Sequence, residues 1–172
     1  LFPLMAPGME VIVSNKLYGG TINLMGKSFR KFGWNAVFVD NDNPEAFRAA
    51  VTDKTRAIFV ESLANPGGVI VDLEAIAKIA QEAEVPLIVD NTMASPWLCR
   101  PFEWGADLVV HSTTKFLSGQ GNAMGGIVID SGRFPWFGNA KYPSLSEPCP
   151  DYNGLTFAET FGDMAFTLYS HA

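Results

Sequence analysis

A lysine and an aspartate lie at the ends of two apolar runs that read as neighbouring strands. Lys115 follows the run Leu108–His111, and Asp90 ends the run that starts at Pro86. A lysine beside a buried strand favours the neutral amine, which is the nucleophile needed to form an imine. A partly desolvated carboxylate needs a cationic partner, such as a protonated ring nitrogen. The pair therefore predicts a site that binds an aromatic heterocycle at opposite ends.

Each of these two residues also has an ordinary structural interpretation. Asp90 could be the N-cap of a helix that follows it, because Asp is a common capping residue. Lys115 could be a surface lysine whose stem packs on apolar atoms while its ammonium group stays in water. For either residue alone, the structural interpretation is favoured. Their placement one strand apart is the observation that favours a shared site.

Other polar side chains follow the same or neighbouring strands. Ser112 and Thr114 are two residues apart, a spacing that puts both hydroxyls on one side of an extended segment, toward a phosphate. Tyr18 precedes two glycines, so its ring could stack on a flat ligand; a buried tyrosine at a strand end is the alternative. Asn65 precedes a Pro-Gly pair, which indicates a turn, and its amide could also donate to a ligand oxygen.

Short apolar runs alternate with helical patterns along most of the chain. Strands are predicted at Glu10–Ser14, Ala36–Asp40, Arg56–Glu61, Pro86–Asp90, Leu108–His111 and Gly126–Asp130. Helices are predicted at Thr21–Phe32, Pro44–Ala50, Leu73–Glu84 and Ala158–Ala172, and a long loop at Phe134–Pro150. This order predicts an α/β fold with a mainly parallel sheet, and the absence of a helix between the last two strands predicts a hairpin-like link and a mixed sheet. Ligands of such sheets bind at the carboxyl ends of the strands, where all the residues above would lie.

The composition excludes several classes of function. A net charge of −6 argues against a nucleic-acid partner. No apolar run approaches the roughly 20 residues that a membrane-spanning helix needs. The two cysteines, Cys99 and Cys149, form no CxxC pair, which predicts free thiols in a cytosolic protein. A charged fraction of only 17% together with 13 Phe predicts that further protein covers part of this surface.

Two other kinds of site are not supported. The stretch from Gly26 to Ser28 resembles the end of a nucleotide-binding loop, but the position five residues before Gly26 is Thr21 and the stretch reads as helix. The only histidines, His111 and His171, lack the spacing of metal ligands, so no metal is expected. We interpret His111 as a core histidine whose hydrogen bonds are satisfied.

Several stretches resemble motifs of the Cys/Met-metabolism enzymes that depend on pyridoxal 5'-phosphate (PLP). The longest matches are V-D-N-T at 89–92, R-P-F-E-W-G-A-D-L-V-V-H-S-T-T-K at 100–115 and G-G-I-V at 125–128. L-Y-G-G-T at 17–21 and E-S-L-A-N-P at 61–66 resemble two further motifs, and all five occur in the family's order. No single motif is specific for this family, but the combination of all five in this order is.

Within that family the chain resembles the O-acetylhomoserine sulfhydrylases most. The stretches that carry this resemblance are W-L-C-R-P-F-E at 97–103, I-D-S-G-R-F at 129–134 and Y-P-S-L-S-E-P-C-P-D-Y-N-G-L at 142–155. Two positions depart from the family pattern: Met93 stands where an aromatic residue is common, and Gln120 where a histidine is common.

The resemblance implies a fold and a set of residue roles. The fold is fold-type I, the three-layer αβα large domain of PLP-dependent transferases with a mostly parallel sheet. Lys115 would form the Schiff base with PLP and act as the base, and Asp90 would bind the ring nitrogen. The other implied cofactor contacts are Ser112 and Thr114 at the phosphate, Tyr18 stacked on the ring with a catalytic role, Asn65 near the phenolic oxygen and Thr92 beside the ring.

The resemblance also implies an activity. O-acetylhomoserine and sulfide or a thiol would give homocysteine or a thioether, plus acetate. The alternatives are a methionine γ-lyase or a cystathionine γ-synthase or lyase, and, in a different class, a non-catalytic assembly domain. The expected protein is a cytoplasmic homotetramer, a dimer of dimers, acting on a small amino-acid substrate. Residues 1–172 would be the central part of its PLP-binding large domain, without the N-terminal segment and the C-terminal small domain, and inactive alone.

Overall fold

The computed structural model describes residues 1–172, whose six strands form one sheet in the order β2-β1-β3-β4-β5-β6. The strands are β1 (Glu10–Ser14), β2 (Asn35–Val39), β3 (Thr55–Glu61), β4 (Leu87–Asp90), β5 (Leu108–Ser112) and β6 (Gly126–Asp130). The first five are parallel, and β6 runs antiparallel to β5. All six predicted strands are present within one residue at each end, and the predicted mixed sheet is confirmed.

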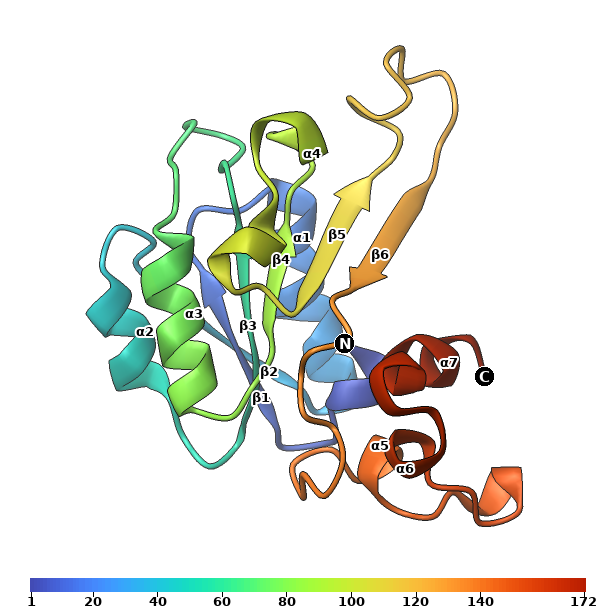
Figure 1. Cartoon of the computed structure of the whole chain (residues 1–172). Helices are drawn as coiled ribbons and strands as arrows, with labels where there is room; N and C mark the ends of the chain where they lie inside the picture. Colours follow the sequence, from blue (N-terminus) through green and yellow to red (C-terminus); the bar gives the residue numbers. More distant parts are fainter.

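Helices cover both faces of this sheet, which gives the three layers expected (Figure 1). The α-helices are α1 (Gly19–Asn23), α2 (Pro44–Ala50), α3 (Leu73–Glu82), α4 (Ser95–Leu98), α5 (Pro143–Ser146), α6 (Phe157–Phe161) and α7 (Ala165–His171). Short 3-10 helices lie at Phe2–Leu4, Phe29–Phe32, Pro101–Trp104, Pro150–Tyr152 and Gly162–Met164, and a π-helical turn at Leu24–Ser28. None of the helices is long and apolar enough to cross a lipid bilayer.

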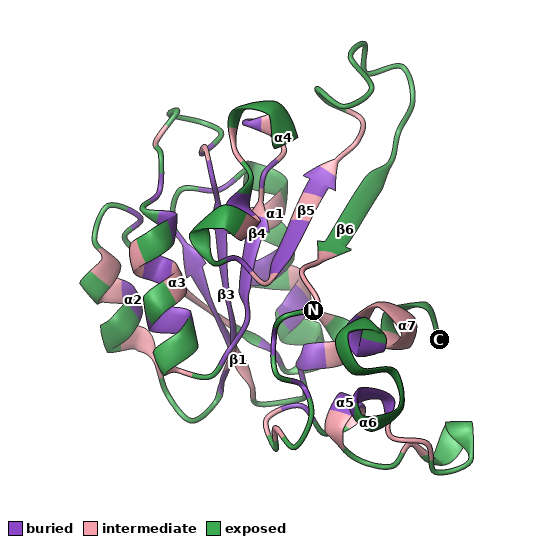
Figure 2. Cartoon of the chain, in the orientation of Figure 1, coloured by how far each residue is buried: buried purple, intermediate pink, exposed green.

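The central strands are buried on both faces, as their continuous apolar runs predicted (Figure 2). In β1, Val11 to Val13 have no exposed surface. Helix α3 packs Ile76 and Ile79 into the core on one side of the sheet, and its predicted N-cap is confirmed, because Asp72 Oδ1 accepts the N–H of Ala75 at 3.0 Å. The edge strand β6 is exposed, and Figure 2 shows the contrast with β3 and β4.

Two of the predicted helices are interrupted. The segment predicted as one helix from 21 to 32 is α1, then the π-helical turn, then a 3-10 helix, and it ends at Gly33, whose φ is 74°. The segment from 158 to 172 divides at Gly162, where φ is 55°. Such left-handed backbone ends a helix, and glycine adopts it without a steric penalty.

The segment from 134 to 150 is the long loop that was predicted, interrupted by the short helix α5, and it contributes side chains to the core. Its large side chains Phe134, Trp136, Tyr142 and Leu145 are buried and belong to the core on the face opposite α3. The rings of Phe134 and Trp136 are 4.4 Å apart between centroids. Packing of these aromatic side chains holds the segment without any periodic pattern, which is why the sequence did not reveal its part in the core.

Candidate active site

The carboxyl ends of three neighbouring strands lie together at one edge of the sheet, at the top of Figure 1. Glu61 at the end of β3 pairs with Asp90 at the end of β4, and Asp90 pairs with Val110 near the end of β5. Residues 112–115 continue from β5 beyond the same edge. The convergence predicted from the strand pattern is therefore present.

Asp90 takes part in a network that connects the ends of β4 and β5. Its Oδ1 accepts the backbone N–H of Thr92 at 2.9 Å and the hydroxyl of Thr92 at 2.5 Å. The same hydroxyl oxygen accepts the N–H of Ser112 at 2.8 Å. Asp90 Oδ2 makes no hydrogen bond within the chain. The interpretation of Asp90 as a helix cap is wrong, because α4 begins only at Ser95 and has no side-chain cap.

The chain leaves β5 at Ser112 and turns over residues 113–118. The expected extended spacing of Ser112 and Thr114 therefore does not occur. The Thr114 hydroxyl donates to the carbonyl of Gly125 at 3.2 Å and accepts the N–H of Gly125 at 3.0 Å, which ties the turn to β6. Lys115 lies in the turn and is exposed, so its expected burial beside the core is wrong. The Ser112 hydroxyl and the Lys115 amine make no hydrogen bond or ion pair within the chain.

Tyr18 lies between β1 and α1, with 56% of its surface exposed. The alternative of a buried tyrosine is therefore wrong. Gly20 is needed for the position of the ring, because a Cβ on Gly20 would lie 2.7 Å from Tyr18 Cε1. Asn65 is exposed in the turn after β3, as its sequence context predicted.

Glu61 belongs to the same edge, although the sequence assigned it no role. Only 4% of its surface is exposed. Its Oε1 accepts the N–H of Tyr18 at 2.6 Å, and its Oε2 accepts the N–H of Asn65 at 2.9 Å. Burial raises the pKa of Glu61, the two N–H groups oppose this, and the charge of Asp90 raises the pKa further. The signal was present: a carboxylate ends the apolar run of β3 just as Asp90 ends that of β4.

His111 lies beneath this edge in β5 and is 5% exposed. The interpretation of His111 as a fully satisfied core histidine is wrong for one atom, since Nδ1 has no hydrogen-bond partner. Burial lowers the pKa of His111, and the charge of Asp90 opposes this. The imidazole is therefore biased toward its neutral form.

The side chains at this edge match the functional groups of PLP. Asp90 offers a carboxylate oxygen without a partner, which suits a protonated ring nitrogen. Lys115 offers an exposed amine, and Ser112 a hydroxyl that no other group of the chain occupies. The Tyr18 ring is exposed, with a glycine leaving room beside it. The arrangement can therefore bind an aromatic aldehyde that carries a ring nitrogen and an anionic group.

Comparison with known proteins agrees with this chemistry. The family model for Cys/Met metabolism PLP-dependent enzymes matches residues 1–148. An O-acetyl-L-homoserine sulfhydrylase of Leptospira meyeri is 50% identical over 162 residues, which cover 94% of this chain and 36% of that protein. A homocysteine synthase of Schizosaccharomyces pombe is 42% identical over 98% of this chain and 40% of its own length. The chain thus spans between a third and a half of the length of these relatives.

Solved structures of PLP-dependent enzymes have the same fold as this chain. An O-acetylhomoserine (thiol)-lyase from Campylobacter jejuni, solved with N'-pyridoxyl-lysine-5'-monophosphate, superposes with a TM-score of 0.91 at 35% identity, over 98% of this chain and 43% of that one. A cystathionine γ-lyase from Lactobacillus plantarum has a TM-score of 0.72 at 40% identity, over 75% of this chain and 34% of that one. The fold-type I large domain expected from the sequence is confirmed. On the family match and these likenesses, this chain belongs to the Cys/Met metabolism PLP-dependent enzymes.

Proposed function

We propose that this chain carries the cofactor-binding part of an enzyme that replaces the acetate of O-acetylhomoserine with sulfide or a thiol. The products are homocysteine or a thioether, plus acetate. The observation that carries the proposal is the placement of the Lys115 amine and the Asp90 carboxylate at one sheet edge, each with a group that nothing in the chain occupies. Relatives with this activity in their names, at up to 50% identity, support the substrate.

The residues proposed to hold PLP are those expected from the sequence, and Asp90, Ser112 and Lys115 have groups that nothing in the chain occupies. Asp90 Oδ2 accepts from the ring nitrogen, and Ser112 donates its hydroxyl to the phosphate, with Thr114 beside it. Tyr18 covers one face of the ring, and the Asn65 amide donates to the phenolic oxygen. Thr92 acts indirectly, because its hydroxyl fixes Asp90 and the start of the turn that carries Lys115. PLP, when bound, supplies an electron sink for charge that develops on the substrate.

Lys115 has two roles in this proposal. It is the covalent attachment point of the cofactor, which its exposure in the turn after β5 allows. When it is not so engaged, its amine is a base that takes the proton from the α-carbon of the substrate and returns it. The network of Asp90, Thr92 and Ser112 connects the strand ends on which both functions depend.

The rest of the assembly is part of the same proposal. Residues 1–172 form the central part of the large domain, and a small domain and further subunits complete a cytoplasmic homotetramer built as a dimer of dimers. Exposed apolar side chains support the presence of covering protein: Trp97 is 91% exposed and Ile70 is 78% exposed. Side chains of this size are usually covered when they gather on a surface.

A second candidate is an elimination at the γ-carbon without replacement, as in a cystathionine γ-lyase. The likeness to the Lactobacillus plantarum enzyme at 40% identity favours it. The full-length enzyme separates the two when it is given O-acetylhomoserine with sulfide in one assay, and cystathionine or methionine in another. Homocysteine in the first assay without 2-oxobutyrate in the second supports the replacement, and 2-oxobutyrate with ammonia in the second supports the elimination. A non-catalytic assembly domain gives product in neither.

Exchange of Lys115 for alanine in the full-length enzyme tests the assignment directly. Lys115→Ala is expected to remove the imine absorbance band that borohydride bleaches, and to lower turnover by about 10³-fold or more, because anchor and base are lost together. Lys78→Ala is the matched control, since Lys78 is an exposed lysine of α3 that pairs with Glu74 far from this edge. Retention of both the band and the turnover in Lys115→Ala contradicts the proposal.

A further inference from the structure

Two loops that leave different strands are tied to one carboxylate. Tyr18 lies on the loop after β1, and Asn65 lies on the turn after β3. The backbone N–H of Tyr18 donates to Glu61 Oε1 at 2.6 Å, and that of Asn65 donates to Glu61 Oε2 at 2.9 Å. Both oxygens of a single buried side chain therefore fix the relative position of the two loops.

Stability of the fold alone does not explain this arrangement. Glu61 is 4% exposed, and no cation forms an ion pair with it. Burial of a carboxylate costs free energy that two backbone N–H groups offset only in part, and an apolar residue would avoid this cost. What a carboxylate provides that an apolar residue lacks is two acceptors at a fixed separation, and hence a defined geometry of both loops.

Glu61 and Asp90 are neighbouring carboxylates that differ in how many of their oxygens are hydrogen-bonded. They are paired in register at the ends of β3 and β4, so two carboxylates lie side by side. Glu61 has both oxygens occupied by backbone N–H groups, whereas Asp90 keeps Oδ2 open. Glu61 therefore faces the protein, and Asp90 alone offers an acceptor to a ligand.

We infer that Glu61 is a positioning residue that holds Tyr18 and Asn65 in the places from which they contact PLP. The inference rests on the proposed function, which assigns both contacts. Glu61 itself touches neither the cofactor nor the substrate in this scheme. Glu61 influences PLP binding only through the two loops that it holds. Loss of its carboxylate is therefore expected to displace the Tyr18 ring and the Asn65 amide together.

The test is Glu61→Gln in the full-length enzyme. Glutamine has the same shape but only one acceptor oxygen, and its NH₂ group opposes the second backbone N–H. In the PLP-free protein, amide hydrogen exchange at Tyr18 and Asn65 is expected to become at least about tenfold faster, while the amides of β3 and β4 stay protected. Titration of the same protein with PLP is expected to show about tenfold weaker binding, with the Lys115 absorbance band still reached at saturation.

Two further variants sharpen this test. Asp107→Asn is the matched control, because Asp107 is also a partly buried carboxylate whose oxygen accepts a backbone N–H, that of Leu87 at 2.8 Å, but at the opposite edge of the sheet. It is expected to change neither the exchange at Tyr18 and Asn65 nor the affinity for PLP. Glu61→Asp keeps the charge, but its shorter side chain reaches only one of the two loops. Its amide exchange rates and its affinity for PLP are expected to lie between those of the wild type and Glu61→Gln.

The outcomes separate this inference from the proposed function. Faster exchange at both amides together with weaker PLP binding supports the positioning role. A Glu61→Gln enzyme whose affinity for PLP equals that of the wild type overturns the inference, even if the two amides exchange faster, because the tie is then only structural. A wild-type enzyme that forms no PLP band overturns the proposed function itself. If Glu61→Gln does not fold, an unchanged PLP affinity in Glu61→Asp overturns the inference in the same way.

Discussion

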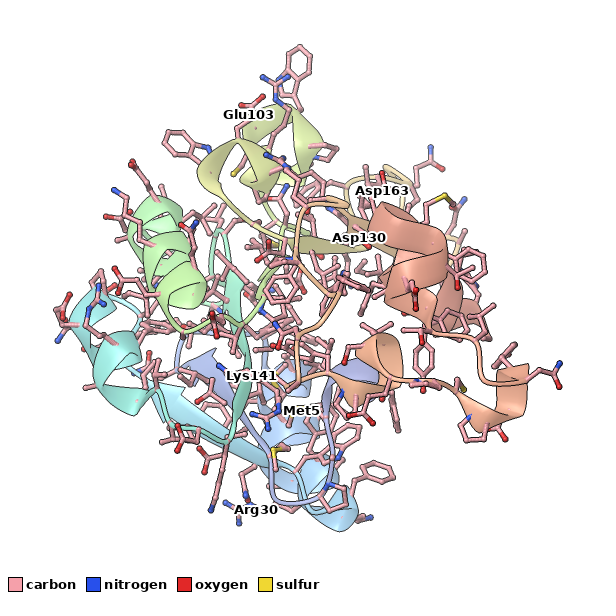
Figure 3. The ribbon with its side chains drawn as sticks, turned by 60° about the horizontal axis from the view of Figure 1, so that its bottom comes forward. Met5, Arg30, Glu103, Asp130, Lys141 and Asp163 are labelled. Carbon is pink, nitrogen blue, oxygen red and sulfur yellow. The ribbon has the colours of Figure 1, made fainter.

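The two edges of the sheet carry similar polar side chains but use them differently. At the amino edge, which Figure 3 brings forward, these side chains bond to the backbone. Asp107 Oδ2 accepts the N–H of Leu87 at 2.8 Å, and the labelled Lys141 donates to the carbonyl of Ala83 at 2.5 Å. The Tyr142 hydroxyl donates to a backbone carbonyl of β3 at 2.9 Å. These three side chains therefore fix nearby backbone at this edge, and Asp107 Oδ1 makes no hydrogen bond within the chain.

At the carboxyl edge several polar groups remain free. Asp90 Oδ2, the Ser112 hydroxyl and the Lys115 amine have no partner within the chain. Glu61, Thr92 and Thr114 are engaged there. Glu61 and Thr92 hold other residues of the proposed site in place, and Thr114 ties the turn after β5 to Gly125. Because open parallel sheets bind their ligands at this edge, we expect the free groups there to contact a ligand.

A sizeable cavity lies at the edge opposite the proposed site. A cavity of about 940 Å³ opens at the amino edge and is lined by Asp107, Arg133 and Lys141 among others. None of the predicted site residues lines it. On its wall, Asp107 Oδ2, the Lys141 amine and the Arg133 guanidinium are already bonded to the backbone. We therefore locate the proposed site by unbonded polar groups at the strand ends rather than by cavity volume.

Among variants that compare the two edges, the largest difference in turnover is expected between Asp90→Asn and Asp107→Asn. In the full-length enzyme, Asp90→Asn is expected to lower turnover by about 10²- to 10⁴-fold, because loss of one member of a desolvated ion pair costs about 3–5 kcal/mol. Asp107→Asn is expected to leave turnover unchanged. Steady-state kinetics of the two variants checks this, and equal losses would remove the distinction between the edges.

A smaller effect concerns stability and pH at the amino edge. Burial raises the pKa of Asp107 from 3.8 to about 6, the N–H of Leu87 opposes this, the charge of Asp130 raises the pKa and that of Arg133 lowers it. Because the folded state holds the proton more tightly than the unfolded state, the stabilisation is complete below about pH 4 and is lost as the pH rises through about 6. The loss amounts to about 2–3 kcal/mol, at about 1.4 kcal/mol per pKa unit.

Asp107→Asn isolates this contribution. The free energy of unfolding of the wild type, relative to that of the variant, is expected to fall between pH 4 and pH 7. Denaturant titrations of both full-length proteins at several pH values measure the difference. Parallel pH dependence in the two proteins contradicts the account of Asp107.

The smallest effect sharpens the role of the carboxyl edge. In Gly20→Ala the added Cβ lies 2.7 Å from the Tyr18 ring, which must rotate away. A side chain forced from its rotamer costs about 0.5–1.5 kcal/mol, so PLP binding is expected to weaken about two- to tenfold with little change in stability. Gly19→Ala is the control, because no atom lies within 4 Å of its Cβ. Equal PLP affinities of the two variants would show that the ring position is unimportant.

The sequence predicted the strands more accurately than the irregular segments. Each strand is a short continuous apolar run, and such a run has few alternatives in an α/β chain. The loop from 134 to 150 was predicted, but its part in the core was not. Trp136 stacks on Phe166 and the Tyr142 hydroxyl donates to the backbone carbonyl of Arg56, and no local pattern records such contacts between residues far apart in the sequence. The break at Gly162 was missed because glycine permits left-handed backbone without requiring it.

By itself, the sequence determined the order of the strands along the chain, the edge at which polar side chains gather, and the identities of Asp90 and Lys115 as the pair to test. These follow from local composition and from the rule that parallel strands end together. Only the tertiary structure decided which groups are free. It shows that Glu61 and Thr92 are engaged, that Lys115 lies exposed in a turn, and that the polar side chains of the amino edge bond to the backbone. The physical reason is that a hydrogen bond between distant residues depends on how strands and loops pack, which no short stretch of sequence specifies.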